Sequence, residues 1–188
     1  DQLALGDDVG SAGRAWLEPI SVLGALAVST SHIGLIATAS TTYSEPFNLA
    51  RQFASLDHIS RGRVGWNIVT SWSAAAAGNF GDDSQVSHSM RYERAEDFVQ
   101  ATEALWDSWG DDALVDDRAS GRYANTAAIN AVNHDGKFYR VTGPLNIPRS
   151  PQGHPVLVQA GSSDTGREFA ARHAEAVFTA HLEKATAK

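Results

Sequence analysis

The Gly-Ser-Ser turn at Gly161–Ser163 has residue types suited to binding an anion. It stands between an uncharged apolar run and a segment with helical spacing of apolar residues. Glycine lets the backbone approach a ligand closely, and serines add hydroxyl donors beside the free N–H groups of a helix N-terminus. Both serines are also good N-cap residues. The turn therefore predicts either an anion site or a structurally capped helix.

Four residues outside the turn have side chains that suit ligand contact. Thr38 and Asn67 fall near the C-terminal ends of apolar runs, and His88 lies in a polar stretch before a helical pattern that includes Tyr92. An imidazole near neutral pH suits polar stabilisation or proton transfer. Each residue also has a purely structural interpretation. In that interpretation Thr38 and Asn67 hydrogen-bond backbone groups at the strand ends, His88 lies on the surface and Tyr92 packs in the core.

A metal site is not expected. The seven histidines show no H-x-x-x-H spacing, and there is no cysteine to supply a thiolate. The paired acids at 111–112 and 116–117 lack the spacing of an EF-hand, so we expect them on the solvated surface.

Apolar runs alternate with helical patterns, which predicts an α/β fold with a parallel sheet. The predicted strands, each expected to be buried, are residues 33–39, 63–69, 155–160 and 176–180. They should be neighbours in that order, with helices on the outer face. The predicted helices are 15–29, 45–61 with Gly62 as C-cap, 91–109 and one after Ser163, with a single helical turn at Ala74–Ala77. Leu17, Leu26 and Ile59 are expected on buried helix faces.

Residues 110–153 interrupt this alternation. Asp135-Gly136 is a strong tight-turn signal, with Ala128–Asn133 and Lys137–Val141 expected to flank it as a small hairpin. The prolines after it predict an extended strap. We therefore predict a single domain over residues 1–188, with an excursion at 110–153 between the helix at 91–109 and the strand at 155–160.

The composition is that of an acidic globular protein. The 188 residues are 43% hydrophobic and 20% charged, with a net charge of −7. This balance disfavours nucleic acid and anionic membrane surfaces as partners. No run of about 18 apolar residues occurs, and the N-terminus lacks the order of a secretory signal, so a cytoplasmic location is expected. The only methionine is Met90, so we expect a processed chain or one cut from a longer protein.

Three stretches, residues 33–71, 91–109 and 138–180, resemble the bacterial luciferase-like superfamily, within its nitrilotriacetate and dibenzothiophene sulfone monooxygenase group. The resemblance covers nearly the whole chain and is weaker over 1–13 and 73–133. It implies a (β/α)₈ TIM barrel, of which this chain would hold strands two to six. A full barrel typically needs about 250 residues.

The resemblance implies a flavin-dependent monooxygenase. Such an oxidoreductase uses reduced FMN, supplied by a separate NAD(P)H:flavin reductase, and O₂ to oxygenate a small organic substrate. The isolated 188-residue chain is expected to show little turnover, and a homo-oligomer of the full-length protein is compatible with the family. The sequence singles out no substrate.

The resemblance also assigns site residues, position by position. Those matched to flavin contacts are Asp1, Thr38, Asn67, His88, Tyr92, Ser162 and Ser163, the two serines being matched to the phosphate. His88 is in addition the candidate catalytic residue. Trp66 and Trp72 flank a strand exit and are expected either to wall the substrate pocket or to pack in the core.

Three rival functions remain open. The nearest is an F420-dependent oxidoreductase of the same superfamily, which moves hydride without O₂ and would be separated by absorption spectra and cofactor extraction. The second is a non-catalytic flavin-binding fragment, which would bind FMN without consuming oxygen. A sugar-phosphate barrel enzyme is disfavoured because no Lys or Glu stands at a strand end as a base.

Overall fold

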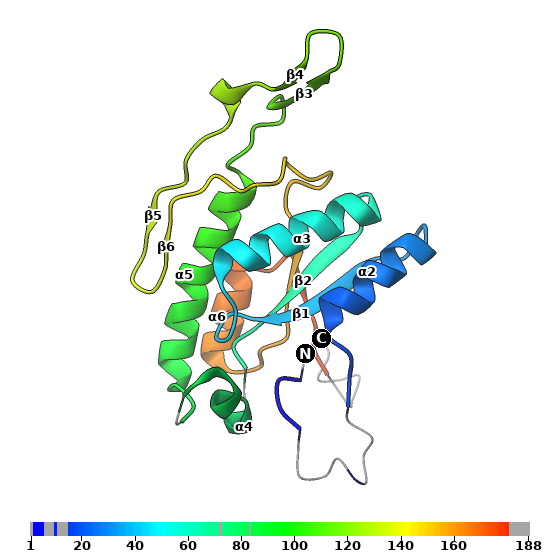
Figure 1. Ribbon diagram of the computed structural model, residues 1–188. Helices are drawn as coiled ribbons and strands as arrows, with labels where there is room; N and C mark the ends of the chain where they lie inside the picture. The colour runs from blue at the N-terminus through cyan, green and yellow to red at the C-terminus, as the bar shows by residue number, and fades with distance from the viewer. Residues whose placement is uncertain (1, 6–9, 11–14, 72, 83, 181–188) are drawn as a thin grey trace.

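A computed structural model describes residues 2–5, 10, 15–71, 73–82 and 84–180 (Figure 1). Asp1, Trp72 and His181 lie outside the described residues. The elements that build the body of the fold are α2 (Pro19–Ser29), β1 (Leu35–Ser40), α3 (Pro46–Ser60), β2 (Val64–Val69), α4 (Ala74–Ala77), α5 (His88–Trp106), β7 (Val156–Gln159), α6 (Asp164–His173) and β8 (Ala176–Val177).

The main sheet has the strand order β1-β2-β7-β8, and every neighbouring pair is parallel. The predicted strands, their order and their direction are therefore confirmed. The register pairs Thr38 with Asn67, and Asn67 with Val158. Parallel strands place their carboxyl ends at one edge, so residues at these ends are brought together.

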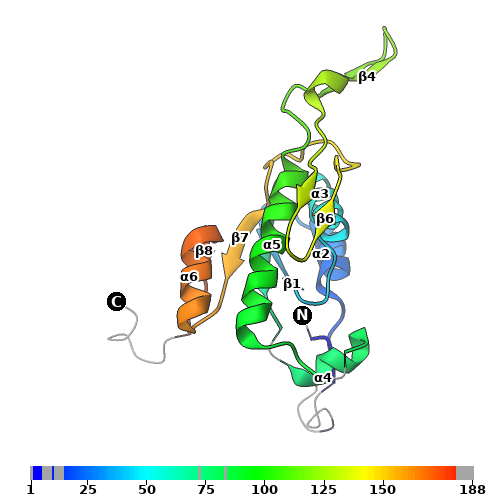
Figure 2. The same ribbon diagram turned by 90° about the vertical axis from the view of Figure 1, so that its left-hand side faces the viewer.

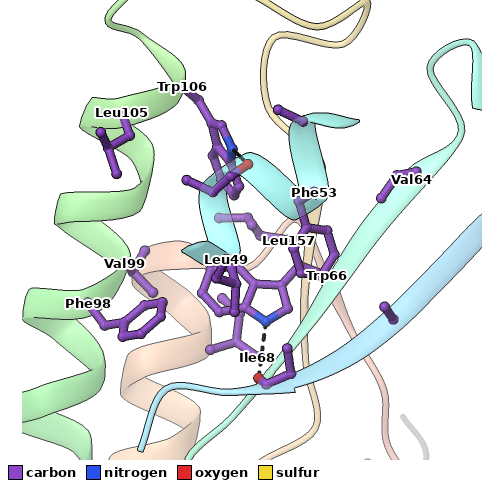
Figure 3. Close-up of a cluster of buried hydrophobic side chains, with 14 of the residues drawn as sticks. Leu49, Phe53, Val64, Trp66, Ile68, Phe98, Val99, Leu105, Trp106 and Leu157 are labelled. Atoms are coloured by element: carbon purple, nitrogen blue, oxygen red, sulfur yellow. Dashed lines mark hydrogen bonds between the residues drawn. The ribbon is translucent and has the colours of Figure 1, made fainter. Parts of the chain in front are cut away.

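The helices pack against one face of this sheet, with α5 and α6 side by side in both views (Figures 1 and 2). The core between them is centred on Trp66, which is fully buried among side chains that include Phe53, Phe98 and Trp106 (Figure 3). The Trp66 indole N–H donates to the Ala39 carbonyl oxygen at 3.1 Å. Of the two expectations for Trp66, core packing is right and a pocket wall is wrong.

The opposite face of the sheet is not buried as expected. Ile36 is 55% exposed, and Val156 and Val177 are exposed as well. Successive strand residues point to opposite faces, and the helices cover the face of Leu35 and Ala37. Ile36 and Val156 therefore lie on the face that the described helices do not cover. Val177 pairs with Gln159 and shares the helix-facing side, but it lies on the edge strand β8 and is 53% exposed.

The boundaries of three helices differ from the prediction for local reasons. Helix α2 begins at Pro19, because the Glu18 carboxylate accepts hydrogen bonds from the N–H groups of Ile20 (2.8 Å) and Ser21 (2.7 Å). Leu17 consequently lies before the helix and is 81% exposed, and Leu26 is also exposed.

Helix α3 begins at Pro46 as predicted, but its C-cap is Arg61 and not Gly62. Arg61 adopts the left-handed conformation with φ 60°, and Gly62 follows with φ 81°. The chain thus turns one residue earlier than the glycine signal indicates. Ile59, in the last turn, is exposed and does not join the buried face.

Helix α5 begins three residues before the predicted start, because the Ser87 side chain caps it by accepting from Met90 N–H at 3.4 Å. His88 therefore occupies the first helical position and not a loop. At the other end the helix stops at Trp106. Trp109 lies beyond it and donates its indole N–H to the Leu145 carbonyl oxygen at 2.7 Å.

The segment between α5 and β7 contains two hairpins. The first, β3 (Leu114–Asp117) with β4 (Arg122–Ala124), projects away from the sheet and was not predicted (Figure 1). The second pairs β5 (His134–Asp135) with β6 (Arg140–Val141) around the predicted turn. The predicted first strand, Ala128–Asn133, does not form, because a 3₁₀ helix ends at Ala128 and Asn133 adopts a left-handed φ of 49°. The first strand is His134–Asp135 instead. Among the described residues no helix is long and apolar enough to cross a membrane.

Candidate functional site

Thr38 and Asn67 form one half of the candidate site. They are register partners on β1 and β2, and Asn67 Nδ2 donates to Thr38 Oγ1 at 3.0 Å. Both residues point to the sheet face that the helices do not cover, because they alternate with buried Ala37 and Trp66. Asn67 Oδ1 is buried and has no hydrogen-bond partner among the described residues. An unsatisfied buried acceptor costs about 1–3 kcal/mol, so this atom suits a ligand that donates an N–H.

His88 and Ser163 form the other half, where the N-termini of α5 and α6 meet. His88 Nε2 lies 3.4 Å from Ser163 Oγ. The His88 ring packs against Tyr92, with 4.9 Å between ring centroids, and Tyr92 packs edge-on against Phe169 at 5.7 Å. Each helix N-terminus carries a partial positive charge and free N–H groups. The meeting of two such ends beside an imidazole favours an anion.

The turn itself separates the roles of its residues. Ser163 Oγ accepts from Gly166 N–H at 3.1 Å, so Ser163 is the N-cap of α6. Ser162 is exposed, and its carbonyl oxygen accepts from Arg167 Nη1 at 3.1 Å. Ser163 therefore caps the helix, as the structural interpretation of the turn predicts. Ser162 is exposed, so it is the serine of the turn that is accessible to a ligand. The Gly161 N–H donates to Gln159 Oε1 and does not join the free N–H groups of the turn.

Glu96 fixes α6 against α5 and so sets the distance between the two helix ends. Its carboxylate accepts from His173 Nε2 at 3.0 Å and pairs with Arg172 Nη1 at 3.3 Å. Burial raises the pKa of Glu96, but the hydrogen bond from His173 and the charges of His173 and Arg172 outweigh burial and hold that pKa below its usual value. The ionised Glu96 carboxylate thus links α5, which carries His88, to α6, which Ser163 caps.

The structure brings His88, Tyr92 and Ser163 together and, on the neighbouring strands, Thr38 with Asn67. Two further polar residues at the same strand ends were not predicted. Tyr43, just after β1, stacks on Phe80 at 4.5 Å, and its buried hydroxyl has no partner among the described residues.

Arg91 is the second polar residue that was not predicted. It is buried in the first turn of α5 and donates to the Ser71 carbonyl oxygen. Ser71 in turn shares a 2.6 Å hydrogen bond with Ser40 at the end of β1. The position of Tyr43, directly after the polar residues that end a strand, was a signal that could have identified it as a site residue. No local signal marked Arg91, since it begins an ordinary helical pattern.

The donor set favours an organic anion over a metal ion. Within the described part of the chain no group of three His, Asp or Glu residues is placed to hold a metal. One half of the site thus suits an anion, and the other half suits a ring that donates an N–H. FMN has both groups, with a phosphate at one end and ring N–H groups at the other.

Comparison with known proteins identifies the family of this chain. The model of the luciferase-like monooxygenase family matches residues 1–188. Nitrilotriacetate monooxygenase component A from Aminobacter aminovorans is 56% identical over 172 residues, which are 92% of this chain and 38% of that protein. Dibenzothiophene-sulfone monooxygenase from Rhodococcus erythropolis is 50% identical over 179 residues, 95% of this chain and 40% of that protein.

Among solved structures, riboflavin lyase with a modified FMN and riboflavin matches with a TM-score of 0.89 and 42% identity. The match covers 95% of this chain and 40% of that one. The chain therefore spans about two fifths of the length of the proteins it matches. The predicted luciferase-like TIM-barrel fold is confirmed, in the part that the four parallel strands represent. Since the family model matches residues 1–188 and the two monooxygenases named above are 56% and 50% identical, the chain belongs to the luciferase-like monooxygenase family.

Proposed function

We propose that this chain supplies flavin-binding residues of an FMN-dependent monooxygenase, an oxidoreductase that oxygenates a small organic substrate. The observation that carries the proposal is the 3.4 Å approach of His88 Nε2 to Ser163 Oγ, where two helix N-termini meet. The names of the relatives, monooxygenases of nitrilotriacetate and of dibenzothiophene sulfone, support the reaction class. The similar riboflavin lyase structure, which holds a modified FMN, supports FMN as the ligand.

The phosphate of FMN fits the junction of α5 and α6. The Ser162 hydroxyl, the free N–H groups of the first turn of α6 and His88 Nε2 are donors there, and the helix dipoles add favourable charge. Ser163 contributes indirectly, by capping α6. Tyr92 holds the His88 ring by packing against it.

The flavin ring fits the strand ends at Thr38 and Asn67. Thr38 accepts the Asn67 amide N–H and so leaves Asn67 Oδ1 to accept an N–H of the ring. Asp1 is a further proposed contact near the ring by family resemblance, and it lies outside the described residues. This division places the ring and the phosphate on different elements, so each end of the ligand can be tested separately.

Reduced FMN, when bound, supplies two electrons to O₂, so that one oxygen atom enters the substrate and the other leaves as water. The residues of this chain orient the ligand and manage protons. His88 Nε2, the candidate catalytic group by family resemblance, lies at the phosphate end of the proposed ligand, so its proposed role is to hold a proton that hydrogen-bonds the phosphate. The Thr38–Asn67 pair orients the ring.

The proposed partner is an NAD(P)H:flavin reductase that supplies reduced FMN, together with O₂ and the substrate. Nitrilotriacetate monooxygenase is itself named as component A, which fits a system of more than one component. A cytoplasmic location follows from the need for NAD(P)H.

The proposal is tested in a chimera in which this chain replaces the matching segment of Aminobacter nitrilotriacetate monooxygenase component A. The chimera is titrated with FMN, riboflavin and F420, and its consumption of ¹⁸O₂ is measured with reduced FMN and nitrilotriacetate. We expect preference for FMN and one ¹⁸O atom per oxidised substrate. Preference for F420 with no oxygen consumption would replace the proposal with a hydride-transfer function. FMN binding without substrate oxidation would leave only a binding role.

A further inference from the structure

Gln159 is a buried polar residue at the end of an otherwise apolar strand. It is 3% exposed, and its register with Ile68 places its side chain on the helix-covered face of the sheet. Leu157, two residues earlier on the same face, belongs to the hydrophobic core. Burying an amide is unfavourable unless the amide is hydrogen-bonded. Packing alone therefore does not account for a glutamine at this position.

The Gln159 side chain closes a short ring with the turn that follows it. Its Oε1 accepts a hydrogen bond from the Gly161 N–H, two residues ahead. Side-chain acceptors that bind a backbone N–H two residues on fix the path of the chain in turns, as Asn and Asp commonly do. The bond therefore sets the direction in which Ser162 and Ser163 leave β7.

The turn is also held from the side of α5. A Cβ atom at Gly161 would lie 2.8 Å from Gln159 Nε2 and 3.0 Å from Tyr92 Oη. A Cβ at Gly166 would lie 2.8 Å from the same Tyr92 Oη. A side chain at either position would have to displace the Gln159 amide or the Tyr92 hydroxyl, so the turn lies in close contact with both groups. This close contact couples the turn to the helix that carries His88.

We propose that Gln159 is a positioning residue for the anion-binding turn. By holding the Gly161 N–H, it aims the Ser162 hydroxyl and the free N–H groups of α6 at the phosphate of FMN, without touching the phosphate itself. The inference rests on the proposed FMN function and adds a residue outside the flavin contacts. Loss of the Gln159 acceptor should therefore weaken binding of the phosphate and leave binding of the ring unchanged.

Two substitutions in the chimera separate positioning from packing. Gln159→Met removes the acceptor and keeps an unbranched side chain of similar volume. Gln159→Asn removes a methylene but keeps an acceptor that reaches an N–H two residues ahead. For Gln159→Met we expect FMN affinity to fall about tenfold and riboflavin affinity to change less than about twofold. For Gln159→Asn we expect FMN affinity within about threefold of the parent.

A role in packing alone predicts the reverse order, because Asn leaves the larger cavity. A greater loss in Gln159→Asn than in Gln159→Met, or equal losses of FMN and riboflavin affinity, would overturn the inference. If circular dichroism shows that Gln159→Met is unfolded, Gln159→Asn decides alone, and a loss of FMN affinity beyond about tenfold contradicts positioning. A parent chimera that does not bind FMN would overturn the proposed function and this inference together.

Discussion

Asn67 donates its side-chain amide to Thr38 across the β1–β2 pair at 3.0 Å, and this bond leaves Asn67 Oδ1 as a buried acceptor without a partner among the described residues. The pair thus offers a fixed acceptor at the carboxyl ends of two parallel strands. TIM-barrel active sites lie at these ends. The orientation of Asn67 depends on Thr38, so the two residues should act as a unit in flavin binding.

Substitution of Thr38 by valine tests this unit. Thr38→Val preserves the side-chain shape but removes the acceptor for Asn67 Nδ2. We expect FMN and riboflavin affinities of the chimera to fall together by about fivefold to tenfold, because the ring and not the phosphate is affected. Flavin fluorescence titration measures both affinities. Thr38→Ser restores the hydroxyl and should restore binding, whereas unchanged affinities in Thr38→Val would remove Thr38 from the site.

The two serines of the turn should give opposite results. A hydrogen bond to a charged group contributes roughly 1.5–3 kcal/mol, so Ser162→Ala should weaken FMN binding about tenfold to a hundredfold and leave riboflavin binding unchanged. Ser163→Ala removes the α6 cap, so its main effect should be a loss of about 1 kcal/mol in the free energy of unfolding. Titrations and urea unfolding of both variants make this comparison. If Ser163→Ala, and not Ser162→Ala, weakened FMN binding without weakening riboflavin binding, Ser163 would be the phosphate ligand.

Asp97 should make stability depend on pH. Burial raises the pKa of its carboxyl group, but hydrogen bonds from Phe138 N–H, His134 and Tyr139 N–H outweigh burial, so the folded-state pKa lies below the ordinary value. Ionised Asp97 therefore stabilises the fold above about pH 4, and this contribution is lost as the pH falls through the folded-state pKa.

The matched variant is Asp97→Asn. Urea unfolding should show a loss of about 1–3 kcal/mol at pH 7 and a smaller difference from the parent near pH 3. An equal difference at both pH values would mean that the charge of Asp97 does not contribute.

Trp66 should matter for stability and not for substrate choice. Trp66→Phe leaves a cavity and removes the indole hydrogen bond to the Ala39 carbonyl oxygen, so we expect a loss of about 2–3 kcal/mol in the free energy of unfolding. Trp16→Phe is the control, since Trp16 is 76% exposed and its replacement should change stability by less than about 0.5 kcal/mol. If the folded Trp66→Phe chimera had a changed KM for nitrilotriacetate, Trp66 would line the substrate pocket.

Much of the fold follows from local sequence patterns. The apolar runs at 33–39, 63–69 and 155–160 predict the order and direction of the strands. A helical pattern lies between successive runs, and a helix between neighbouring strands makes those strands parallel. Burial of both sheet faces could not be predicted correctly, since Ile36 and Ala37 have similar polarity and opposite environments. The β3–β4 hairpin was missed because its strands are exposed except at Ala124 and carry no alternating pattern.

The site was predictable at the level of residue types and not of roles. The Ser162-Ser163 pair marks the turn, but only the Gly166 N–H bond distinguishes the cap from its neighbour. His88 looks like a loop residue until Ser87 is identified as the helix cap. Gln159 was the lone polar residue of its strand, and this contrast was a signal that could have identified it.

We expect one flavin to span the α5–α6 junction and the Thr38–Asn67 pair. A crystal structure of the chimera with FMN would show both ends of the ligand at once. The phosphate should lie within hydrogen-bond distance of the Ser162 hydroxyl and His88 Nε2, and a ring N–H should donate to Asn67 Oδ1. A phosphate bound away from both Ser162 and His88 would rule out this binding mode.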